Sequence, residues 1–551
     1  MGQWCHQDDI AKLDKLIVIP DHLQYYLGCQ LGTKVPDQRP EVLHICSMTK
    51  LIGTTFWPES WHMMKPGVIL TMKVRRMLRG HLDNAIVKAS NTGERAKLKK
   101  QGSSRSTFSV RFVTLRAALC IAGTASFYVL FMVLLHTLGP ESTRKHAADT
   151  LDSLSYKLSL QKRFHAVIMD AGSTGSRVLA FTFHRSLMDG TLKIDDELFG
   201  EVKPGLSSYA DAPAKGAESL QQLLEMANSV IPEPERHKTP LVLKATAGLR
   251  LLPSEKAENL LNEVRDLFYK SGYQVSKNSV SIMDGMDEGI YSWFTINFLR
   301  SLLDESIDET VAALDLGGGS TQITFVPQDA EVFADVPQDF VVSLNALNKE
   351  LKFYTYSYLG LGLMAARAEI FKANLTEDNL VRSPCISPIV KQDWEYGGVS
   401  YKLMGLQKPK YKKFRVLATG KMDENRPIAD FYQCIQIASN LVLKKVHKPP
   451  ELSKRKINAI SYFYDRAVES GLIHPVDGGE VTVKDYFKAA ETACEEANVD
   501  QPFQCIDLTY ISALLHYGYG LQLSVPLELR KKIEGHETSW ALGAAYHILN
   551  S

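Results

Sequence analysis

The chain has 551 residues, which is enough for two or three domains. Hydrophobic residues make up 45% and charged residues 23%, and these values exclude a wholly disordered or fibrous chain. The formal net charge of +1 offers no general attraction to nucleic acid, so we expect no such partner. The charge is unevenly spread, because residues 1–116 contain 18 Lys and Arg against 9 Asp and Glu, whereas the remainder contains 45 against 53. This asymmetry predicts two parts in different surroundings.

A single apolar segment separates these parts. Residues 117–138 contain no Asp, Glu, Lys or Arg, and a helix of this length spans roughly 30 Å of hydrocarbon. The alternative is a buried core helix, but the segment has no polar stripe and Gly139-Pro140 ends it. Basic residues gather before the segment, so the positive-inside rule places the N-terminus in the cytosol. We therefore predict one transmembrane helix at 117–138 and a single-pass type II membrane protein whose C-terminal part faces a lumen or the cell exterior.

The segments on either side of this helix carry few signals of their own. Residues 1–116 have apolar patches without a sustained period, and we predict a poorly ordered cytosolic region there. Residues 139–160 are predicted to form a luminal stalk. Asn374 begins the sequence Asn-Leu-Thr, a glycosylation acceptor that is usable only in a lumen.

Cysteine usage agrees with an oxidising compartment. Beyond the apolar segment there are four cysteines, namely Cys385, Cys434, Cys494 and Cys505. Four cysteines permit three pairings, among which we favour the sequential one. None has the CxxC spacing that is typical of a zinc site.

The C-terminal part opens with a strand–turn–strand pattern that occurs twice. Apolar residues 164–169 precede the turn DAGSTGS at 170–176, and a second strand is predicted at 177–183. Likewise, residues 311–314 precede DLGGGSTQ at 315–322, and a strand follows at 323–325. An internal repeat of a supersecondary unit predicts two related lobes.

Between and after the two copies, helices and strands alternate. Helices are predicted at 216–230, 254–271, 285–303 and 537–549, and a strand at 241–246. This alternation is typical of α/β lobes with mixed sheets. We assign residues 161–283 and 527–551 to lobe I and residues 284–526 to lobe II.

The two repeated turns have the composition of phosphate-binding loops. Their glycines let successive backbone N–H groups face an anion, and hydroxyl donors stand beside them at Ser173, Thr174, Ser176, Ser320 and Thr321. Asp170 and Asp315 occupy the same place in each copy and would repel phosphate, but a hard divalent cation between carboxylate and phosphate removes that conflict. The alternative for either loop alone is an ordinary tight hairpin turn. Two copies with Asp in register favour the phosphate interpretation.

Hydrolysis also needs an activated water, and the segment 281–289 is a candidate source of the base. Its acidic residues gather at a predicted helix start, where Glu288 falls in the first turn. The alternative is simple capping, since acidic residues suit a helix N-terminus. A third small-residue loop, KATAGLR at 244–250, offers Thr246 as a phosphate or water ligand. Arg250 in the same loop either pairs with an anion or braces the loop.

Taken together, these residues resemble a known family, the ectonucleoside triphosphate diphosphohydrolases or apyrases. Five ordered motifs resemble its conserved regions, namely DAGSTGS at 170–176, ATAGLR at 245–250, MDEG at 286–289, DLGGGSTQ at 315–322 and SYLGLGLMAAR at 357–367. The resemblance covers roughly residues 160–550. Three further segments resemble the short branch of nucleoside diphosphatases found in the Golgi, the endoplasmic reticulum or secretions, namely 203–211, 461–468 and 537–544.

The resemblance implies an α/β fold with two ribonuclease-H-like lobes of the actin/sugar-kinase/heat-shock ATPase superfold. It implies cleavage of a terminal phosphate with Ca²⁺ or Mg²⁺, with Glu288 as the catalytic base and Ser320 and Gln322 holding the attacking water. Asp170 and Asp315 match the residues that bind the metal through waters. The implied phosphate-binding residues are Ser173, Thr174, Gly175, Thr246, Gly318 and Gly319. Gly319 stands where the family usually has Ala, a mild departure that leaves the backbone donors in place. The branch's disulfides resemble the two sequential pairs favoured above.

The branch usually prefers nucleoside diphosphates, above all UDP and GDP, to triphosphates, and its implied role is to clear the by-product of luminal glycosyl transfer. We therefore expect a monomeric diphosphatase facing the lumen of the Golgi or endoplasmic reticulum, or released from it by cleavage. The alternatives are a broad nucleoside triphosphatase and a nucleotide-binding ectodomain that has lost catalysis. A kinase or chaperone ATPase of the same superfold is disfavoured by the predicted topology. Tyr462, Tyr464 and Trp540 are candidate nucleobase neighbours, with core packing as the alternative for each.

Overall fold

The computed structural model contains two compact units, Met1–Val113 and Thr114–Ser551. The structure describes parts of the second unit only, so the predicted disorder of residues 1–116 lies outside the described residues. The described residues are 123, 126–137, 139–158, 160–187, 190–303, 306–346, 349–376, 378–414, 424–496 and 498–550.

The predicted membrane span lies partly outside these residues. Residues 126–137 are helical, as is Gly123, and the rest of 117–138 is not described. Among the residues that the structure describes, none of the helices combines the length and the apolar character needed to cross a membrane. The transmembrane helix therefore stays a prediction from the sequence.

The predicted stalk contains a helix, α6 (Glu141–Lys157), that is tied to the following lobe. Asp152 is buried, and its Oδ1 accepts hydrogen bonds from the backbone N–H of Leu187 at 3.0 Å and from Gln161 Nε2 at 3.2 Å. Asp149 pairs with Lys193 at 2.7 Å. Instead of a free spacer, these residues form a helix docked on the folded part.

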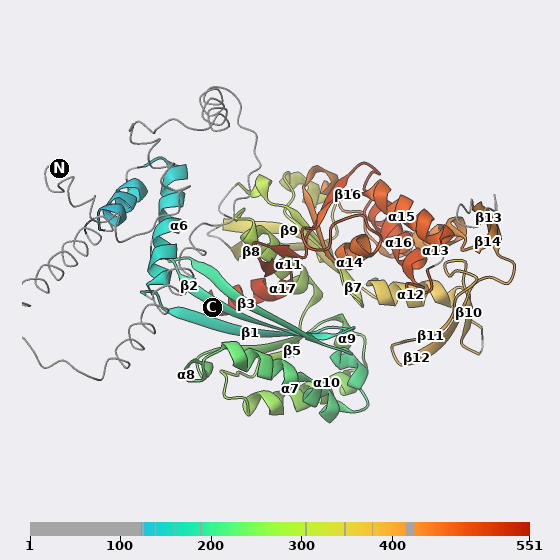
Figure 1. Cartoon of the computed structure of the whole chain (residues 1–551), viewed down its shortest axis with the longest axis horizontal. Helices are drawn as coiled ribbons and strands as arrows, with labels where there is room; N and C mark the ends of the chain where they lie inside the picture. The colour runs from blue at the N-terminus through green and yellow to red at the C-terminus, as the bar shows by residue number, and fades with distance from the viewer. Residues whose placement is uncertain are drawn as a thin grey trace, which may run out of the picture. The chain divides into compact units, whose positions relative to one another are not determined.

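The first sheet has five strands in the order β3-β2-β1-β4-β5 (Figure 1). They are β1 (Arg163–Ala171), β2 (Ser176–Arg185), β3 (Leu192–Val202), β4 (Leu241–Ala245) and β5 (Val280–Ile282). β1 is antiparallel to β2 and parallel to β4. Its apolar run is continuous because both faces are covered: α7 (Pro213–Val230) and α10 (Ser254–Tyr269) pack on one, and α17 (Trp540–Asn550) on the other.

The second sheet repeats the first and extends it. Its seven strands follow the order β16-β17-β15-β6-β7-β9-β8. They are β6 (Ala312–Leu316), β7 (Ser320–Phe325), β8 (Val341–Ala346), β9 (Lys349–Leu359), β15 (Ile457–Ser461), β16 (Gly479–Thr482) and β17 (Pro526–Leu529). β6 is antiparallel to β7 and parallel to β15, as β1 is to β2 and β4. The series β9-β7-β6-β15-β17 thus reproduces β3-β2-β1-β4-β5, so the predicted internal repeat is confirmed.

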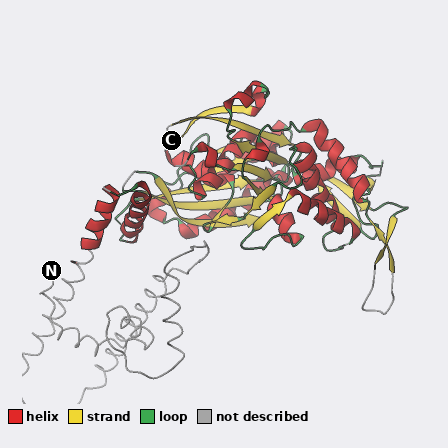
Figure 2. Ribbon diagram, turned by 90° about the horizontal axis from the view of Figure 1, so that it is seen from above, coloured by secondary structure: helices red, strands yellow, loops and turns green. Residues whose placement is uncertain are grey.

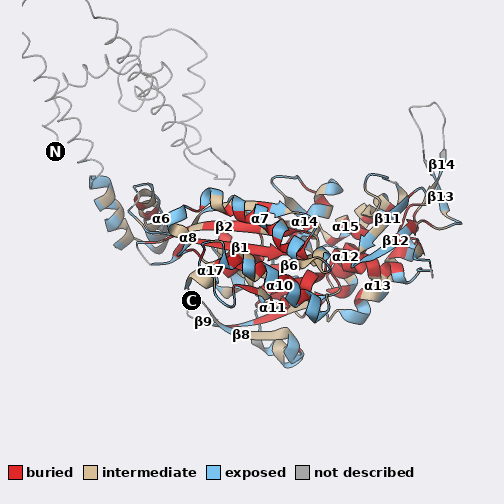
Figure 3. Ribbon diagram, turned by 90° about the horizontal axis from the view of Figure 1, so that it is seen from below, coloured by how far each residue is buried: buried red, intermediate tan, exposed pale blue. Residues whose placement is uncertain are grey.

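Helices cover both faces of the second sheet (Figure 2). α11 (Gly285–Leu299) packs on one face through Trp293 and Ile296. The other face carries α12 (Leu363–Lys372), α13 (Phe431–Lys445), α14 (Tyr462–Glu469), α15 (Val483–Glu495) and α16 (Gln504–Ala513). The central strands β1, β2 and β6 are largely buried (Figure 3). The helices predicted at 216–230, 254–271, 285–303 and 537–549 correspond to α7, α10, α11 and α17.

Shorter elements complete the described part. They are α8 (Glu233–Arg236), α9 (Ala247–Arg250), β10 (Leu380–Arg382), β11 (Lys391–Tyr396), β12 (Val399–Met404), β13 (Lys410–Phe414), β14 (Glu424–Ile428), β18 (Lys532–Ile533) and β19 (His536–Glu537). The lobe boundary predicted at residue 527 falls inside β17, which belongs to the second sheet. After β17 the chain returns to the first sheet, on which α17 packs.

The sequential disulfide pairing is confirmed. Cys385 joins Cys434 on α13, and Cys494 on α15 joins Cys505 on α16. Both bonds lie in the helical layer of the second lobe, and all four cysteines are buried.

We predict unequal contributions of the two disulfides to stability. The bonds close loops of 49 and 11 residues, so chain entropy assigns about 4 kcal/mol to Cys385–Cys434 and about 3 kcal/mol to Cys494–Cys505. Denaturant unfolding of two double Cys→Ala variants, one for each bond, measures the difference. A larger loss on removing the shorter loop would mean that local packing outweighs chain entropy here.

Candidate active site

A cleft of about 640 Å³ lies between the two repeated hairpin turns. Most of the residues singled out from the sequence line it, namely Asp170, Ser173, Thr174, Thr246, Glu288, Asp315, Gly318, Gly319 and Ser320. Gly175 and Gln322 are not part of its lining. Gln322 nevertheless reaches the site through hydrogen bonds to two lining side chains.

The two turns have the same local construction. Asp170 is the penultimate residue of β1 and Asp315 the penultimate residue of β6. In the first turn the N–H of Gly172 donates to the carbonyl of Gly175, and in the second the N–H of Gly317 donates to that of Ser320, both at 3.0 Å. The repeat therefore places the two carboxylates at equivalent strand ends that face one cleft.

The turns approach each other so closely that the second requires glycine. A Cβ on Gly318 would collide with the Ser173 side chain and lie 2.9 Å from Thr174 Cγ2. Glycine removes this obstruction and leaves the backbone N–H groups accessible to an anion. The contact holds the two predicted phosphate loops face to face.

The three carboxyl groups at the cleft are buried and repel one another. The pKa of Asp170 is raised to about 6, chiefly by burial and also by the nearby Asp315, while Arg177 lowers it. Burial likewise raises the pKa of Asp315. The Oδ1 atom of Asp170 is buried and has no hydrogen-bond partner. Positive charge in addition to that of Arg177 would stabilise the anionic form of Asp170.

A hydrated divalent cation fits this donor set. Hard cations bind carboxylate oxygens, and Mg²⁺ commonly keeps several waters. In the part of the chain that the structure describes, no group of three or more His, Cys, Asp or Glu side chains is arranged to bind a metal. Asp170 and Asp315 acting through water molecules agree with the preference of such cations for carboxylate oxygens and for retained waters. They also agree with the finding that the described residues contain no cluster of three direct ligands.

Glu288 lies in the first turn of α11, where it is only 7% exposed. Its Oε2 accepts a hydrogen bond from Gln322 Nε2 at 3.0 Å and pairs with the guanidinium of Arg250. The same Gln322 nitrogen lies 2.8 Å from Ser320 Oγ. The structure thus brings together the three residues predicted to act on the attacking water.

Electrostatics favour a neutral Glu288 in the metal-free protein. The pKa of Glu288 is raised to about 8, chiefly by burial, and Arg250 opposes this shift. Asp315 and Asp170 contribute to the rise, since a third negative charge would join theirs. A cation that neutralises the two aspartates therefore also favours the ionised form of Glu288.

The helix-capping role that was the alternative for residues 281–289 is filled by Asp284 and not by Glu288. Asp284 is the N-cap of α11, and its Oδ1 accepts from the N–H of Met286 at 2.8 Å. Because Asp284 satisfies this end of the helix, Glu288 is available for its contacts in the cleft.

Three contacts were not anticipated from the sequence. Arg177 lies opposite Asp170 in the β1–β2 register and donates to its Oδ2 at 3.2 Å, so strand pairing alone would have indicated it. Ser357 accepts a hydrogen bond from Gln322 at 2.9 Å. For Arg250 the sequence left open whether it pairs with an anion or braces its loop. The structure shows that it pairs with an anion, the carboxylate of Glu288.

The remaining sequence candidates lie in varied environments. Tyr462, Tyr464 and Trp540 all line the cleft, but Tyr464 and Trp540 are only 4% exposed. Tyr464 donates its hydroxyl to the carbonyl of Pro475 at 2.7 Å, as expected of a core side chain. Asn374 follows α12 and is half-buried, and its Nδ2 is inaccessible to solvent. Glycosylation at Asn374 would require this side chain to turn outward.

Comparisons with known proteins show which sequences and structures this chain resembles. Residues 157–551 match the model of the GDA1/CD39 (nucleoside phosphatase) family. The chain is 43% identical to ectonucleoside triphosphate diphosphohydrolase 5 of Gallus gallus, over 71% of this chain and 88% of that protein. It is also 43% identical to the Homo sapiens nucleoside diphosphate phosphatase ENTPD5, over 70% of this chain and 88% of that protein. A solved nucleoside triphosphate hydrolase from Neospora caninum matches with a TM-score of 0.49 and 16% identity, over 74% of this chain and 96% of that chain.

We predict that the metal-free protein loses stability as the pH rises. The folded-state pKa values of Asp170 and Glu288, about 6 and about 8, exceed their ordinary values of 3.8 and 4.5. Between these limits the folded state binds more protons than the unfolded state, so the free energy of unfolding falls from roughly pH 4 to roughly pH 8. The melting temperature in EDTA should fall across this range, and added Mg²⁺ or Ca²⁺ should reduce the decline.

The double variant Asp170→Asn/Glu288→Gln is the matched control for this measurement. Removing two titrating groups should flatten the pH dependence in EDTA. A melting temperature that rises with pH in the parent protein would contradict the assignment of buried, raised carboxyl groups.

Proposed function

The chain belongs to the GDA1/CD39 (nucleoside phosphatase) family, and on this premise we propose that it hydrolyses the terminal phosphate of nucleoside diphosphates, UDP and GDP first, and of triphosphates less readily. The observation that carries the proposal is the contact of Glu288 with Gln322 and of Gln322 with Ser320, beside two facing phosphate-type loops. The order of substrates rests on the short-branch motifs and on the relative named as a nucleoside diphosphate phosphatase.

The proposed mechanism assigns the phosphates to the loops. Backbone N–H groups of the turns at 172–175 and 317–320, with the hydroxyls of Ser173 and Thr174, would hold the phosphate oxygens. These donors are fixed by the hairpins before substrate binds, so they stabilise developing charge without reorganisation. Thr246 lies at the same wall of the cleft and would contribute a further hydroxyl.

The attacking water is assigned to the other side of the cleft. Ser320 and Gln322 would orient the water, and Glu288 would accept its proton at the carboxylate as the bond to the terminal phosphorus forms. The bond from that phosphorus to the bridging oxygen would break, and the nucleotide shortened by one phosphate would leave with the electron pair on that oxygen. Arg250 holds the Glu288 carboxylate in place and opposes its protonation. Asp170 and Asp315 would hold Ca²⁺ or Mg²⁺ through waters, and the bound cation would supply charge neutralisation at the phosphates.

The same residues disfavour the first of the two alternatives, and relative rates test the second. A nucleotide-binding ectodomain without catalysis has no need for a buried glutamate hydrogen-bonded to a water-orienting pair. A broad triphosphatase would use the same phosphate loops, so only the relative rates on diphosphates and triphosphates separate it from a diphosphatase. Phosphate release from UDP, GDP and ATP, with and without EDTA, makes that comparison. Equal rates in EDTA would contradict the need for a divalent cation.

We predict that Glu288→Gln reduces turnover of UDP by about 10²–10⁴-fold, the usual loss for a positioned general base. The amide keeps the size of the side chain but cannot accept the proton. Calorimetry should show that binding of UDP persists. The matched control is Asp287→Asn, which changes the neighbouring acid on the same helix but does not border the cleft. Normal turnover by Glu288→Gln would remove this residue from the mechanism.

The setting of the enzyme is a further part of the proposal. The charge-free segment 117–138 with its basic upstream flank supports a type II anchor, with residues 139–551 in the lumen of the Golgi or endoplasmic reticulum. The two disulfides support an oxidising compartment. The repeated sheet order supports two ribonuclease-H-like lobes, with β17 (Pro526–Leu529) in the second lobe and α17 in the first. We propose that the enzyme is a monomer. There the enzyme would remove the nucleoside diphosphate left by glycosyl transfer.

We predict that the full-length chain stays with membranes after carbonate extraction, because a 22-residue apolar helix holds it there. Its C-terminal part should be protected from added protease until detergent is present. A variant with two arginines placed within 126–132 should extract into the soluble fraction. Digestion of the C-terminal part without detergent would reverse the proposed orientation.

A further inference from the structure

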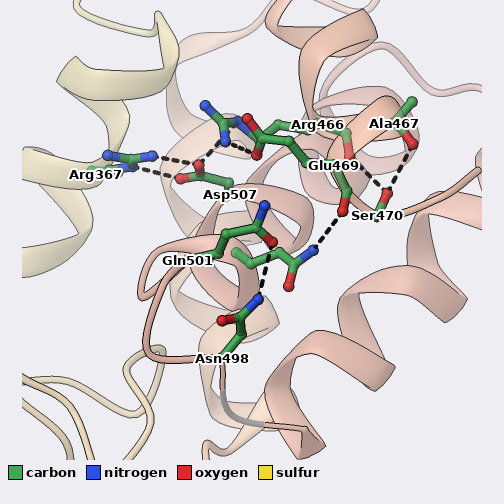
Figure 4. Close-up of polar contacts among 9 residues, drawn as sticks. Arg367, Arg466, Ala467, Glu469, Ser470, Asn498, Gln501 and Asp507 are labelled. Carbon is green, nitrogen blue, oxygen red and sulfur yellow. Dashed lines mark hydrogen bonds and ion pairs between the residues drawn. The ribbon is translucent and has the colours of Figure 1, made fainter. Parts of the chain in front are cut away.

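Two motifs singled out in the sequence contain arginines to which the proposed mechanism gives no role. Arg367 closes the motif at 357–367, and Arg466 lies in the motif at 461–468. The structure brings these arginines to a single carboxylate, that of Asp507, which lies between them (Figure 4). Nothing in the local sequence around Asp507 indicates this position.

Asp507 lies on α16 and is fully buried. Arg367 binds it through two parallel contacts, Nε to Oδ1 at 2.5 Å and Nη2 to Oδ2. Arg466 Nε lies 3.3 Å from Oδ2, and the Arg466 guanidinium also pairs with Glu469. A buried carboxylate is tolerated when charged partners surround it, and here two helices other than its own supply them.

The helix that carries Arg367 also holds the second phosphate loop. At the start of α12, the N–H of Leu363 donates to the carbonyl of Gly317 at 2.8 Å, and the N–H of Met364 donates to that of Gly318 at 3.0 Å. Met364 also lines the cleft. Arg367 lies one turn further along α12 and does not line the cleft. The ion pair with Asp507 therefore fixes the helix on which the loop rests.

The helix that carries Arg466 forms the opposite part of the cleft wall. Tyr462 and Arg466 on α14 line the cleft, and the Arg466 guanidinium carbon lies 5.3 Å from the centre of the Tyr462 ring. Glu469, the last residue of α14, borders both the cleft and a second cavity of about 640 Å³. The buried face of α14 packs in the core of the second lobe through Phe463 and Ala467. The ion pairs of Arg466 with Asp507 and Glu469 add a polar restraint on the side of the helix that lines the cleft.

We propose that Asp507 is a positioning residue that sets the spacing between the phosphate loop at 317–319 and the Tyr462–Arg466 wall. The inference rests on the proposed function and specifies which ligands this spacing allows to bind more tightly. A nucleoside diphosphate is long enough to contact the loop with its phosphates and the wall with its nucleoside. Inorganic pyrophosphate contacts the loops alone. Asp507 thereby favours the binding of nucleotides over that of inorganic phosphates without touching either.

The substitution Arg367→Lys tests the positioning role of Asp507 with a small change to the buried ion pair. Lysine keeps the positive charge but loses the planar fork that fixes α12 relative to α16. We expect the KM for UDP to rise by about tenfold with kcat changed less than about twofold, which is the signature of lost binding instead of lost chemistry. The inhibition constant of pyrophosphate against UDP should stay the same. Asp507→Asn should act in the same direction and more strongly.

The matched control is Arg455→Lys. Arg455 is another buried arginine of the second lobe, and its Nη2 donates to the carbonyl of Ile307 at 2.9 Å and to Thr310 Oγ1 at 2.8 Å. It does not line the cleft. A general loss of stability would lower the apparent kcat in all three variants and leave each KM as it is, so this pattern would overturn the inference.

Direct binding separates this inference from the proposed function. Calorimetry with Mg²⁺ gives the dissociation constants of UDP and pyrophosphate for the parent protein and for Arg367→Lys. Absence of UDP turnover by the parent would refute the proposed function, yet a selective loss of UDP affinity in the variant would still support Asp507 as a positioning residue. Equal changes for the two ligands, or no change for either, would refute the positioning role whether or not the parent turns over UDP.

Discussion

The burial of three carboxyl groups around one cleft is the constraint on which the rest of the site depends. Asp170, Asp315 and Glu288 are each less than 10% exposed, and burial raises the pKa of each. Repulsion by neighbouring carboxylates raises the pKa of Asp170 and of Glu288 as well. Burying these groups as anions costs free energy, and two arginines offset part of that cost, Arg177 at Asp170 and Arg250 at Glu288. The remaining negative charge is suited to a divalent cation, and the facing turns supply donors for the phosphates that would accompany it.

The duplication explains how one hairpin design serves two purposes. In each lobe one residue of the next strand is paired with the aspartate, and the first copy has Arg177 there while the second has Gln322. Arginine stays with its own aspartate at 3.2 Å. Glutamine, which carries no charge, instead reaches Glu288 and Ser320. In the proposed mechanism, the exchange of one side chain at equivalent positions would separate a phosphate-and-metal side from a water side.

Much of this site is predictable from sequence because it is encoded locally. The turns at 170–176 and 315–322 each combine an aspartate, glycines and hydroxyls within eight residues, and their repetition predicted two equivalent lobes and one shared cleft. Contacts such as Arg250 with Glu288, or Asp507 with Arg367, join segments 38 and 140 residues apart. No local pattern marks them, since they depend on how α11, α12 and α16 pack. The docking of α6 escaped prediction for the same reason: Asp152 finds its partners in the lobe that follows.

The phosphate end and the nucleoside end of the cleft are held by different kinds of interaction. Backbone hydrogen bonds position the turns and join α12 to the second of them, so most side-chain substitutions leave the donors in place. The wall formed by α14 packs on the core through Phe463 and Ala467, and the side chains of Arg466, Glu469 and Asp507 add ion pairs to it. Under the positioning role proposed for Asp507, changes in this ion-pair network would alter the affinity for nucleotides relative to pyrophosphate, while the hairpins and the Glu288 contacts stay the same. The proposed role therefore separates phosphate binding, which rests largely on backbone donors, from the preference for nucleotides, which rests on a few buried charges.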